Sequence, residues 1–110
     1  DPLPLSPEIA ASKFAALGSD QRLGVLTTLV RAGHDGLSMG ELGDRTGITG
    51  STLTHHLKIL TAAGLVTQAR QGRSVICAAA DYTEVRGLSD YLLRECCADS
   101  ARHDEDHNDG

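Results

Sequence analysis

The chain has 110 residues, is 40% hydrophobic and 23% charged, and contains 12 Gly, 3 Pro, 3 Cys and no Trp. This composition is typical of a globular protein of one domain. No apolar stretch reaches the roughly 18 residues that a bilayer span requires, and the N-terminus lacks the basic-then-apolar layout of a signal peptide. We therefore expect neither a membrane protein nor a secreted one, and the odd number of cysteines favours the reducing cytoplasm.

The net charge of −5 is unevenly distributed along the chain. Residues 99–110 hold five acids and one base, and we expect them to form a disordered acidic tail behind a folded domain of residues 1–98. Residues 45–80, in contrast, contain Arg45, Lys58, Arg70 and Arg73 and neither Asp nor Glu. A segment of charge +4 in an acidic protein indicates a surface that binds a polyanion, with chance clustering as the alternative.

The first third of the chain has the periodicity of two helices. Pro7 suits the first position of a helix that ends at Gly18, and a second helix is capped by Ser19 or Asp20 and ends at Gly33. Their predicted apolar stripes are Ala10, Phe14 and Leu17 in the first, and Leu23, Leu26, Leu29 and Val30 in the second.

The next two predicted helices flank a tight turn. Ser38 and Glu41 have the spacing of a capping box at the start of a short helix that ends at Gly47. Thr49 or Ser51 caps a longer helix that carries Leu53, Leu57 and Leu60 on one face and ends at Gly64. Two helices joined in this way predict a helix-turn-helix.

The C-terminal part predicts a β-hairpin and a last helix. Residues 65–70 and 74–80 are β-capable and are separated by Gln71, Gly72 and Arg73. Asp81 caps a helix that reaches Cys97, with Val85, Leu88, Leu92 and Cys96 on one stripe. The expected fold is mainly α with a β-hairpin wing, in the order α-α-α-α-β-β-α. The apolar stripe has no obvious partner within so short a chain, so we expect a homodimer formed through the first and last helices.

Two segments carry a family resemblance. Residues 46–66, which include Ser51-Thr-Leu-Thr-His-His-Leu57 and Ala63-Gly-Leu-Val66, and the following residues 69–73 resemble the recognition helix and wing of the ArsR/SmtB family of bacterial repressors. Phe14-Ala-Ala-Leu-Gly-Ser-Asp-Gln-Arg-Leu23 is similar to the usual opening of that family. The resemblance covers roughly residues 13–97 and implies a winged helix-turn-helix repressor that binds operator DNA.

The polar side of the longer helix carries the candidate DNA contacts. If its leucines point into the core, small hydroxyls, an imidazole and an ammonium point outward, where they can approach groove edges and phosphates. Arginines on the hairpin can reach the adjacent backbone or minor groove. The candidate DNA-binding residues are Ser51, Thr52, Thr54, His55, Lys58, Arg70 and Arg73. A solvated helix face and a charged turn are the alternatives, and His56 is either a packed histidine or a base reader.

Cysteines near the C-terminus are the candidate sensor. Cys96 and Cys97 resemble the adjacent pair of an arsenic-responsive subgroup, whose third cysteine is replaced here by His103. The resemblance implies trivalent arsenic as the inducer, and His103 with His107 would favour zinc or cadmium instead. Thiol oxidation, a response to sulfide and plain packing are the alternatives. Cys77 is expected to be a buried small hydrophobic residue.

The residues indicate no catalysis, because no nucleophile-base set, phosphate loop or pair of carboxylates is visible. The sequence thus predicts a cytoplasmic repressor that needs no cofactor to bind DNA and that a thiophilic ligand releases. A winged-helix module that binds another protein is the alternative from a different class.

Overall fold

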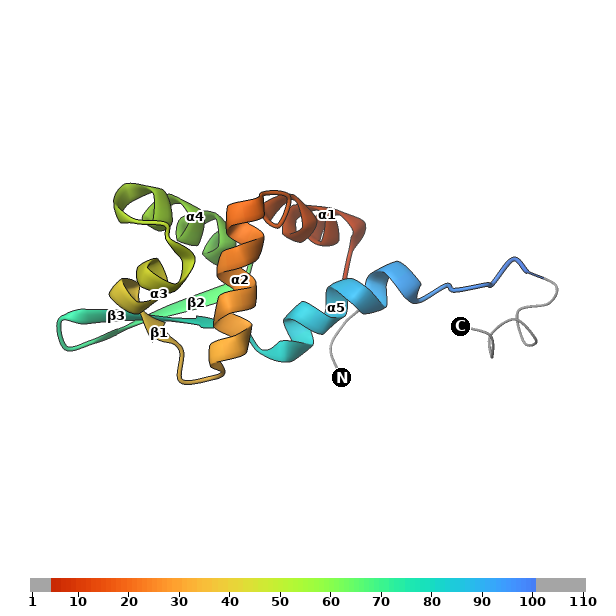
Figure 1. Ribbon diagram of the computed structural model, residues 1–110. Helices are drawn as coiled ribbons and strands as arrows, with labels where there is room; N and C mark the ends of the chain where they lie inside the picture. Colours follow the sequence, from red (N-terminus) through yellow and green to blue (C-terminus); the bar gives the residue numbers. More distant parts are fainter. Residues whose placement is uncertain (1–4, 101–110) are drawn as a thin grey trace.

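The computed structural model describes residues 5–100. Its elements, in chain order, are α1 (Pro7–Ala16), α2 (Asp20–Ala32), β1 (Leu37–Ser38), α3 (Met39–Thr46), α4 (Gly50–Ala62), β2 (Val66–Gln71), β3 (Ser74–Ala79) and α5 (Tyr82–Leu93), as labelled in Figure 1. This order confirms the predicted winged helix-turn-helix. The predictions for His103, His107 and residues 101–110 of the acidic tail lie outside the described residues.

Side-chain caps determine where the first three helices begin. The hydroxyls of Ser6 and Ser19 accept hydrogen bonds from backbone amides three residues further on, at 3.1 and 3.3 Å. At α3 the predicted capping box is present, since the Glu41 amide donates to the Ser38 hydroxyl and the Ser38 amide donates to the Glu41 carboxylate. The bond from the Ser38 amide lowers the pKa of Glu41.

The sheet has three antiparallel strands in the order β1-β3-β2. The hairpin register runs from Val66 opposite Ala79 to Gln71 opposite Ser74, so its turn is shorter than the three residues expected from the sequence. Strand β1 was not predicted, because two residues are too few for an alternating pattern. It pairs with β3 beside Gly36, which has φ +72° and where a Cβ would overlap the carbonyl oxygen of Cys77.

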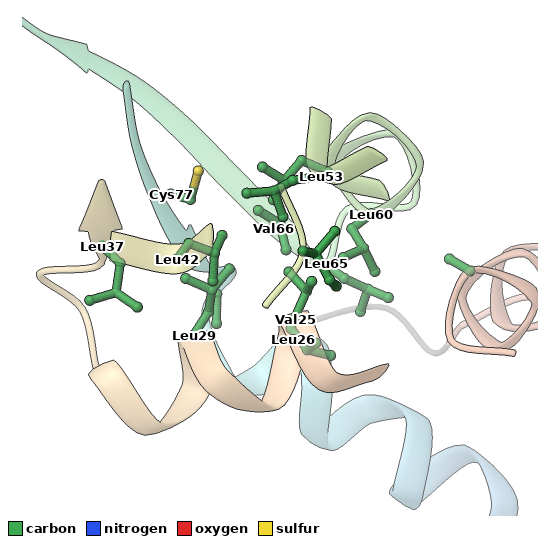
Figure 2. Packing of buried hydrophobic residues seen from close by; sticks show 14 of the residues in the cluster. Val25, Leu26, Leu29, Leu37, Leu42, Leu53, Leu60, Leu65, Val66 and Cys77 are labelled. Atoms are coloured by element: carbon green, nitrogen blue, oxygen red, sulfur yellow. The ribbon is translucent and has the colours of Figure 1, made fainter. Parts of the chain in front are cut away.

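One apolar core joins the helices to the base of the hairpin. In Figure 2, side chains from α2, α3, α4 and the hairpin converge on one another. Val25, Leu29, Leu42, Leu60 and Leu65 have no measurable exposure. The three leucines predicted to face inward from α4 are all buried, so the opposite face of α4 is turned to solvent.

The environments predicted for two apolar side chains, Leu23 and Leu88, are wrong. Leu23 is 47% exposed, and the buried stripe of α2 runs instead through Val25, Leu26 and Leu29. Leu88 is buried within the chain and belongs to the core, so it is not left over for a second subunit. The reason is that α1 and α5 pack against each other, which places the middle of α5 over the domain.

The predicted end of the last helix is also wrong. Helix α5 ends at Leu93, and residues 94–99 form turns closed by short-range bonds, such as that from the Cys96 amide to the Leu93 carbonyl. Cys97 has φ +63°, which an α-helix does not accommodate. The C-terminal end of α5 and the turns after it extend away from the rest of the domain (Figure 1), and Leu92, Leu93 and both cysteines are exposed.

A buried lysine joins three helices. Lys13 of α1 lies on the buried face of its helix, and its ammonium donates to the Ala63 carbonyl at the end of α4 over 2.7 Å. It also lies 3.4 Å from the carboxylate of Glu84 on α5. A cation suits this place because carbonyls without partners point out of a helix C-terminus. Lys13 thereby attaches the end of α4 to the first and last helices.

Candidate nucleic-acid interface

Helix α4 presents a hydroxyl-rich face to solvent. Leu53, Leu57 and Leu60 anchor it to the core, and all five candidate DNA-binding residues of this helix are exposed, namely Ser51, Thr52, Thr54, His55 and Lys58. The Thr54 hydroxyl donates to the Gly50 carbonyl over 3.3 Å. The structure thus brings these side chains together on the face opposite the leucines.

The start of α4 leaves backbone amides without a side-chain cap. Thr49 occupies the cap position, but its side chain accepts no hydrogen bond from the helix, and the first turn contains no acid. The positive end of the helix dipole and free amides make such a helix start attractive to a phosphate. Of the two residues that the sequence allowed, Thr49 and not Ser51 occupies the N-cap position, but its side chain does not cap the helix.

Two arginines lie on the wing. Arg70, near the end of β2, and Arg73, in the turn, are both exposed. The hairpin projects past α3 on the side of the domain opposite α5 (Figure 1). The candidate residues therefore lie on two neighbouring projections, the outer face of α4 and the wing, which both belong to the acid-free segment 45–80.

His56 is buried against α2 and is not a base reader. Its Nε2 lies 2.8 Å from Oε1 of Gln21, and its Nδ1 lies 3.4 Å from a terminal nitrogen of Arg22. Burial is the main cause that lowers the pKa of His56, and the Arg22 charge acts in the same direction. Arg22 also donates from Nε to the Ala16 carbonyl over 2.6 Å. The packed alternative for His56 is the one found.

Sequence reasoning missed the partners Gln21 and Arg22, as well as Lys13. Nothing in the local pattern around α2 indicates that two of its polar side chains meet α4. Lys13 had a detectable signal, because it lies three residues after Ala10 and three before Ala16, both of which are buried. A lysine in the middle of an apolar helix stripe indicates a buried cation with a specific partner.

The three cysteines are in two different environments. Cys77 is fully buried, as predicted, its thiol lies 3.6 Å from the Met39 sulfur, and burial raises its pKa. Cys96 and Cys97 are exposed, with 3.3 Å between their sulfur atoms. The hydrogen bond with Cys96 raises the pKa of Cys97. The pair can thus reach a single thiophilic centre.

Neither a metal-binding cluster nor a membrane span occurs within residues 5–100. In that part of the chain, three or more His, Cys, Asp or Glu side chains nowhere gather as a metal site would require. His103, the predicted third ligand, is outside this range. The helices between residues 5 and 100 also include none with the length and apolar character needed to span a bilayer.

Comparison with known proteins identifies the class. A family model described as a helix-turn-helix domain matches residues 17–69. YceK of Bacillus subtilis, an uncharacterized HTH-type transcriptional regulator, is 36% identical over 67 residues, which are 61% of this chain and 66% of that protein. The match thus spans just under two thirds of the length of that relative.

Solved structures extend the likeness over most of the chain. HlyU from Vibrio cholerae is 30% identical with a TM-score of 0.65, over 82% of this chain and 94% of its own. An ArsR-like transcriptional regulator from Rhodococcus sp. RHA1 is 29% identical with a TM-score of 0.69, over 86% of this chain and 85% of its own. A homodimeric winged helix-turn-helix DNA-binding domain from Mycobacterium bovis is 22% identical with a TM-score of 0.63, over 91% and 84%, and shows the fold alone.

The fold of the chain, with α3, α4 and the wing, indicates the same class of protein as its similarity to these regulators. The chain belongs to the ArsR-type family of winged helix-turn-helix transcriptional regulators.

Proposed function

We propose that this chain is a homodimeric repressor that places one α4 helix of each protomer in the major groove of operator DNA. The observation that carries the proposal is the outer face of α4, which is exposed, rich in hydroxyls and free of acids, beside a wing with two exposed arginines. Thr52 and His55 would read base edges, and Arg70 and Arg73 would contact phosphates. A dimer would then address a site with two half-sites.

The test starts with duplexes enriched from random DNA by the purified protein. Binding is measured by fluorescence anisotropy over a salt series, for the enriched duplex and for a scrambled one. His55→Ala should reduce the preference for the enriched duplex, whereas Arg73→Ala should weaken both complexes and reduce the salt slope by roughly one per lost phosphate contact. Arg31→Ala, an exposed arginine at the far end of α2, is the matched control. Unchanged affinity in both interface variants would contradict the proposal.

The proposed dimer rests on exposed apolar side chains of α1 and α5. Ile9, Leu92 and Leu93 are 51%, 67% and 65% exposed, and their two helices pack side by side in one chain. A second copy would remove these side chains from water. The domain from Mycobacterium bovis, which has the same fold, is homodimeric.

Sedimentation at micromolar concentration tests the dimer. Leu92→Glu should yield monomers, because it places a charge in an apolar interface, while Leu23→Glu on α2 should remain dimeric. A monomeric wild type would refute this part of the proposal. Leu88→Glu is unsuitable, because Leu88 is in the core and its loss would test folding instead.

For the inducer, we propose trivalent arsenic bound by Cys96 and Cys97. Both thiols are exposed, and a sulfur separation of 3.3 Å allows one centre to bridge them. Arsenous acid, As(OH)3, would react with two thiols to give a dithiolate As–OH species and two water molecules. Closing this ring would change the backbone at Cys97 and the end of α5, and thereby favour another arrangement of the subunits.

Two arsenicals separate the roles of the pair and of a third ligand. Phenylarsine oxide needs only two sulfurs, whereas arsenite gains from a third donor such as His103. Cys96→Ser and Cys97→Ser should each keep DNA binding and lose release by both arsenicals, while Cys77→Ala should keep both properties. His103→Ala should weaken the response to arsenite or zinc and spare that to phenylarsine oxide. Release in the double cysteine variant would show that the sensor lies elsewhere.

Oxidation of the same pair is the second candidate, favoured by the same short distance between exposed sulfurs. A peroxide would oxidise one thiol to a sulfenic acid, and the neighbouring thiol would displace water to form a disulfide. Titration of the DNA complex with hydrogen peroxide, followed by mass spectrometry, should then show release with the loss of two hydrogens. Release by arsenicals alone would favour the ligand over the redox response.

A further inference from the structure

His56 adjoins the proposed reading face without belonging to it. It follows His55, with ring centroids 5.9 Å apart, but the two rings differ in environment, since His55 is exposed and His56 is 8% exposed. Through Gln21 and Arg22, His56 connects the middle of α4 to the start of α2. Its position affects how α4 is oriented and not what α4 touches.

The partners of His56 determine its protonation state. An arginine side chain only donates hydrogen bonds, so the Nδ1 that faces Arg22 must carry the lone pair. The proton of the neutral ring then resides on Nε2, which donates to Oε1 of Gln21 over 2.8 Å. Both contacts are satisfied by one neutral tautomer only.

Protonation of Nδ1 would break this arrangement. The new N–H would point at the Arg22 guanidinium 3.4 Å away, and two cations would face each other in a partly buried place. The charges that act on His56 are Arg22 from α2 and the His55 ring from its own helix, neither of which can stabilise an imidazolium. Helix α1 contributes the Ala16 carbonyl, but that group binds Arg22.

We propose that neutral His56 is a positioning residue for α4, and that its protonation in mild acid displaces the helix and weakens DNA binding. The inference rests on the proposed DNA-binding function. It adds a pH response to that function, and the response uses neither the cysteine pair nor any ligand. Displacement of Arg22 would also loosen its bond to the end of α1, so the change extends from α4 to the first helix.

The size of the effect follows from the fraction of competent protein. If only the neutral form binds DNA, the apparent Kd rises by the inverse of the neutral fraction. An imidazole pKa is ordinarily about 6.5, and that of His56 is lowered, so at pH 5.5 the weakening is at most about tenfold. Protonation of exposed histidines acts in the opposite direction, because it adds positive charge near DNA.

The experiment compares Kd at pH 7.5 and 5.5 for the full chain and the enriched duplex. Wild type should bind more weakly at pH 5.5 than at pH 7.5, by up to about tenfold. His56→Gln, which offers an amide but no titrating group, should show no weakening. His55→Gln is the matched control on the neighbouring residue and should keep the weakening, whatever its own effect on affinity. Equal pH dependence of wild type and His56→Gln would overturn the proposal.

A second variant should move the response instead of removing it. Gln21→Glu keeps an oxygen in reach of Nε2 and adds a negative charge, which favours the imidazolium. The weakening should then begin at a higher pH than in wild type. The same change in the His56→Gln background should have no such effect, and a shift there would contradict the role of His56.

NMR separates this inference from the proposed function. Imidazole nitrogen spectra at pH 7.5 should show the proton of His56 on Nε2. In the His55→Gln background, which removes the exposed imidazole next to them, the backbone amides of Thr52, Thr54 and Lys58 should shift on acidification. They should not shift when His56→Gln is added. If no duplex is bound at any pH, the proposed function fails, and the amide shifts still decide whether His56 moves α4. Their absence in His55→Gln would overturn the inference.

Discussion

Lys13→Met tests whether the buried ammonium stabilises the junction of α1, α4 and α5. The methionine retains most of the aliphatic stem but loses the bond to the Ala63 carbonyl, which is 2.7 Å long. Hydrogen bonds with a charged partner contribute about 1.5–3 kcal/mol, so we expect a loss of about 2 kcal/mol in the free energy of unfolding. For a domain of this size, that loss lowers Tm by on the order of 10 °C.

The ion pair with Glu84 should contribute much less. The Glu84 side chain is 50% exposed, and a pair at 3.4 Å with one solvated partner is worth less than about 1 kcal/mol. Urea unfolding at one fixed protein concentration, in low and high salt, measures both variants. Lys13→Met should lose stability equally at both salt concentrations, and Glu84→Gln should lose little. A Lys13→Met variant as stable as wild type would refute the reasoning, since desolvation of the ammonium would then cancel its hydrogen bond.

Three further predictions concern the glycines, the core and the cysteines. Gly36→Ala should lower the free energy of unfolding by several kcal/mol, because its Cβ would overlap the Cys77 carbonyl. Gly72→Ala, at φ +62° in open space, should lower it by only about 1 kcal/mol, and thermal melting measures both variants. Leu60→Ala should lower the free energy of unfolding, measured in urea, by about 2–5 kcal/mol. A loss below about 1 kcal/mol would mean that the core collapses around the cavity. Cys77 should resist iodoacetamide in the folded chain while Cys96 and Cys97 react, as mass spectrometry would show, because Cys77 is buried with a raised pKa.

The lowered pKa of His56 also predicts how stability varies with pH. In the unfolded chain this imidazole takes up its proton near pH 6.5, but in the folded chain only at lower pH. The contribution of His56 to the free energy of unfolding is therefore complete above pH 6.5 and is lost as the pH falls towards the folded pKa. Urea midpoints of wild type should decrease more than those of His56→Gln between pH 7.5 and 5.5, and parallel curves would contradict this.

Local sequence determined most of the helices and the hairpin. The caps at Ser6, Ser19 and Ser38, the glycine after α2 and the leucine periodicity of α4 each act within a few residues, so they could be interpreted without knowledge of the fold. The inward position of Leu53, Leu57 and Leu60 determines in turn that the polar residues of α4 face solvent. The candidate contact face could therefore be predicted from sequence.

Only the tertiary structure decided which polar side chains are internal. Lys13 meets Ala63 and Glu84, and His56 meets Gln21 and Arg22, across separations of 34 to 71 residues. The same is true of β1, which exists only because β3 lies beside it. Whether Leu88 is covered while Leu92 is not depends on how far α5 extends past the core. Such contacts arise when separate elements come together, and the periodicity of a single element contains no information about its distant partner.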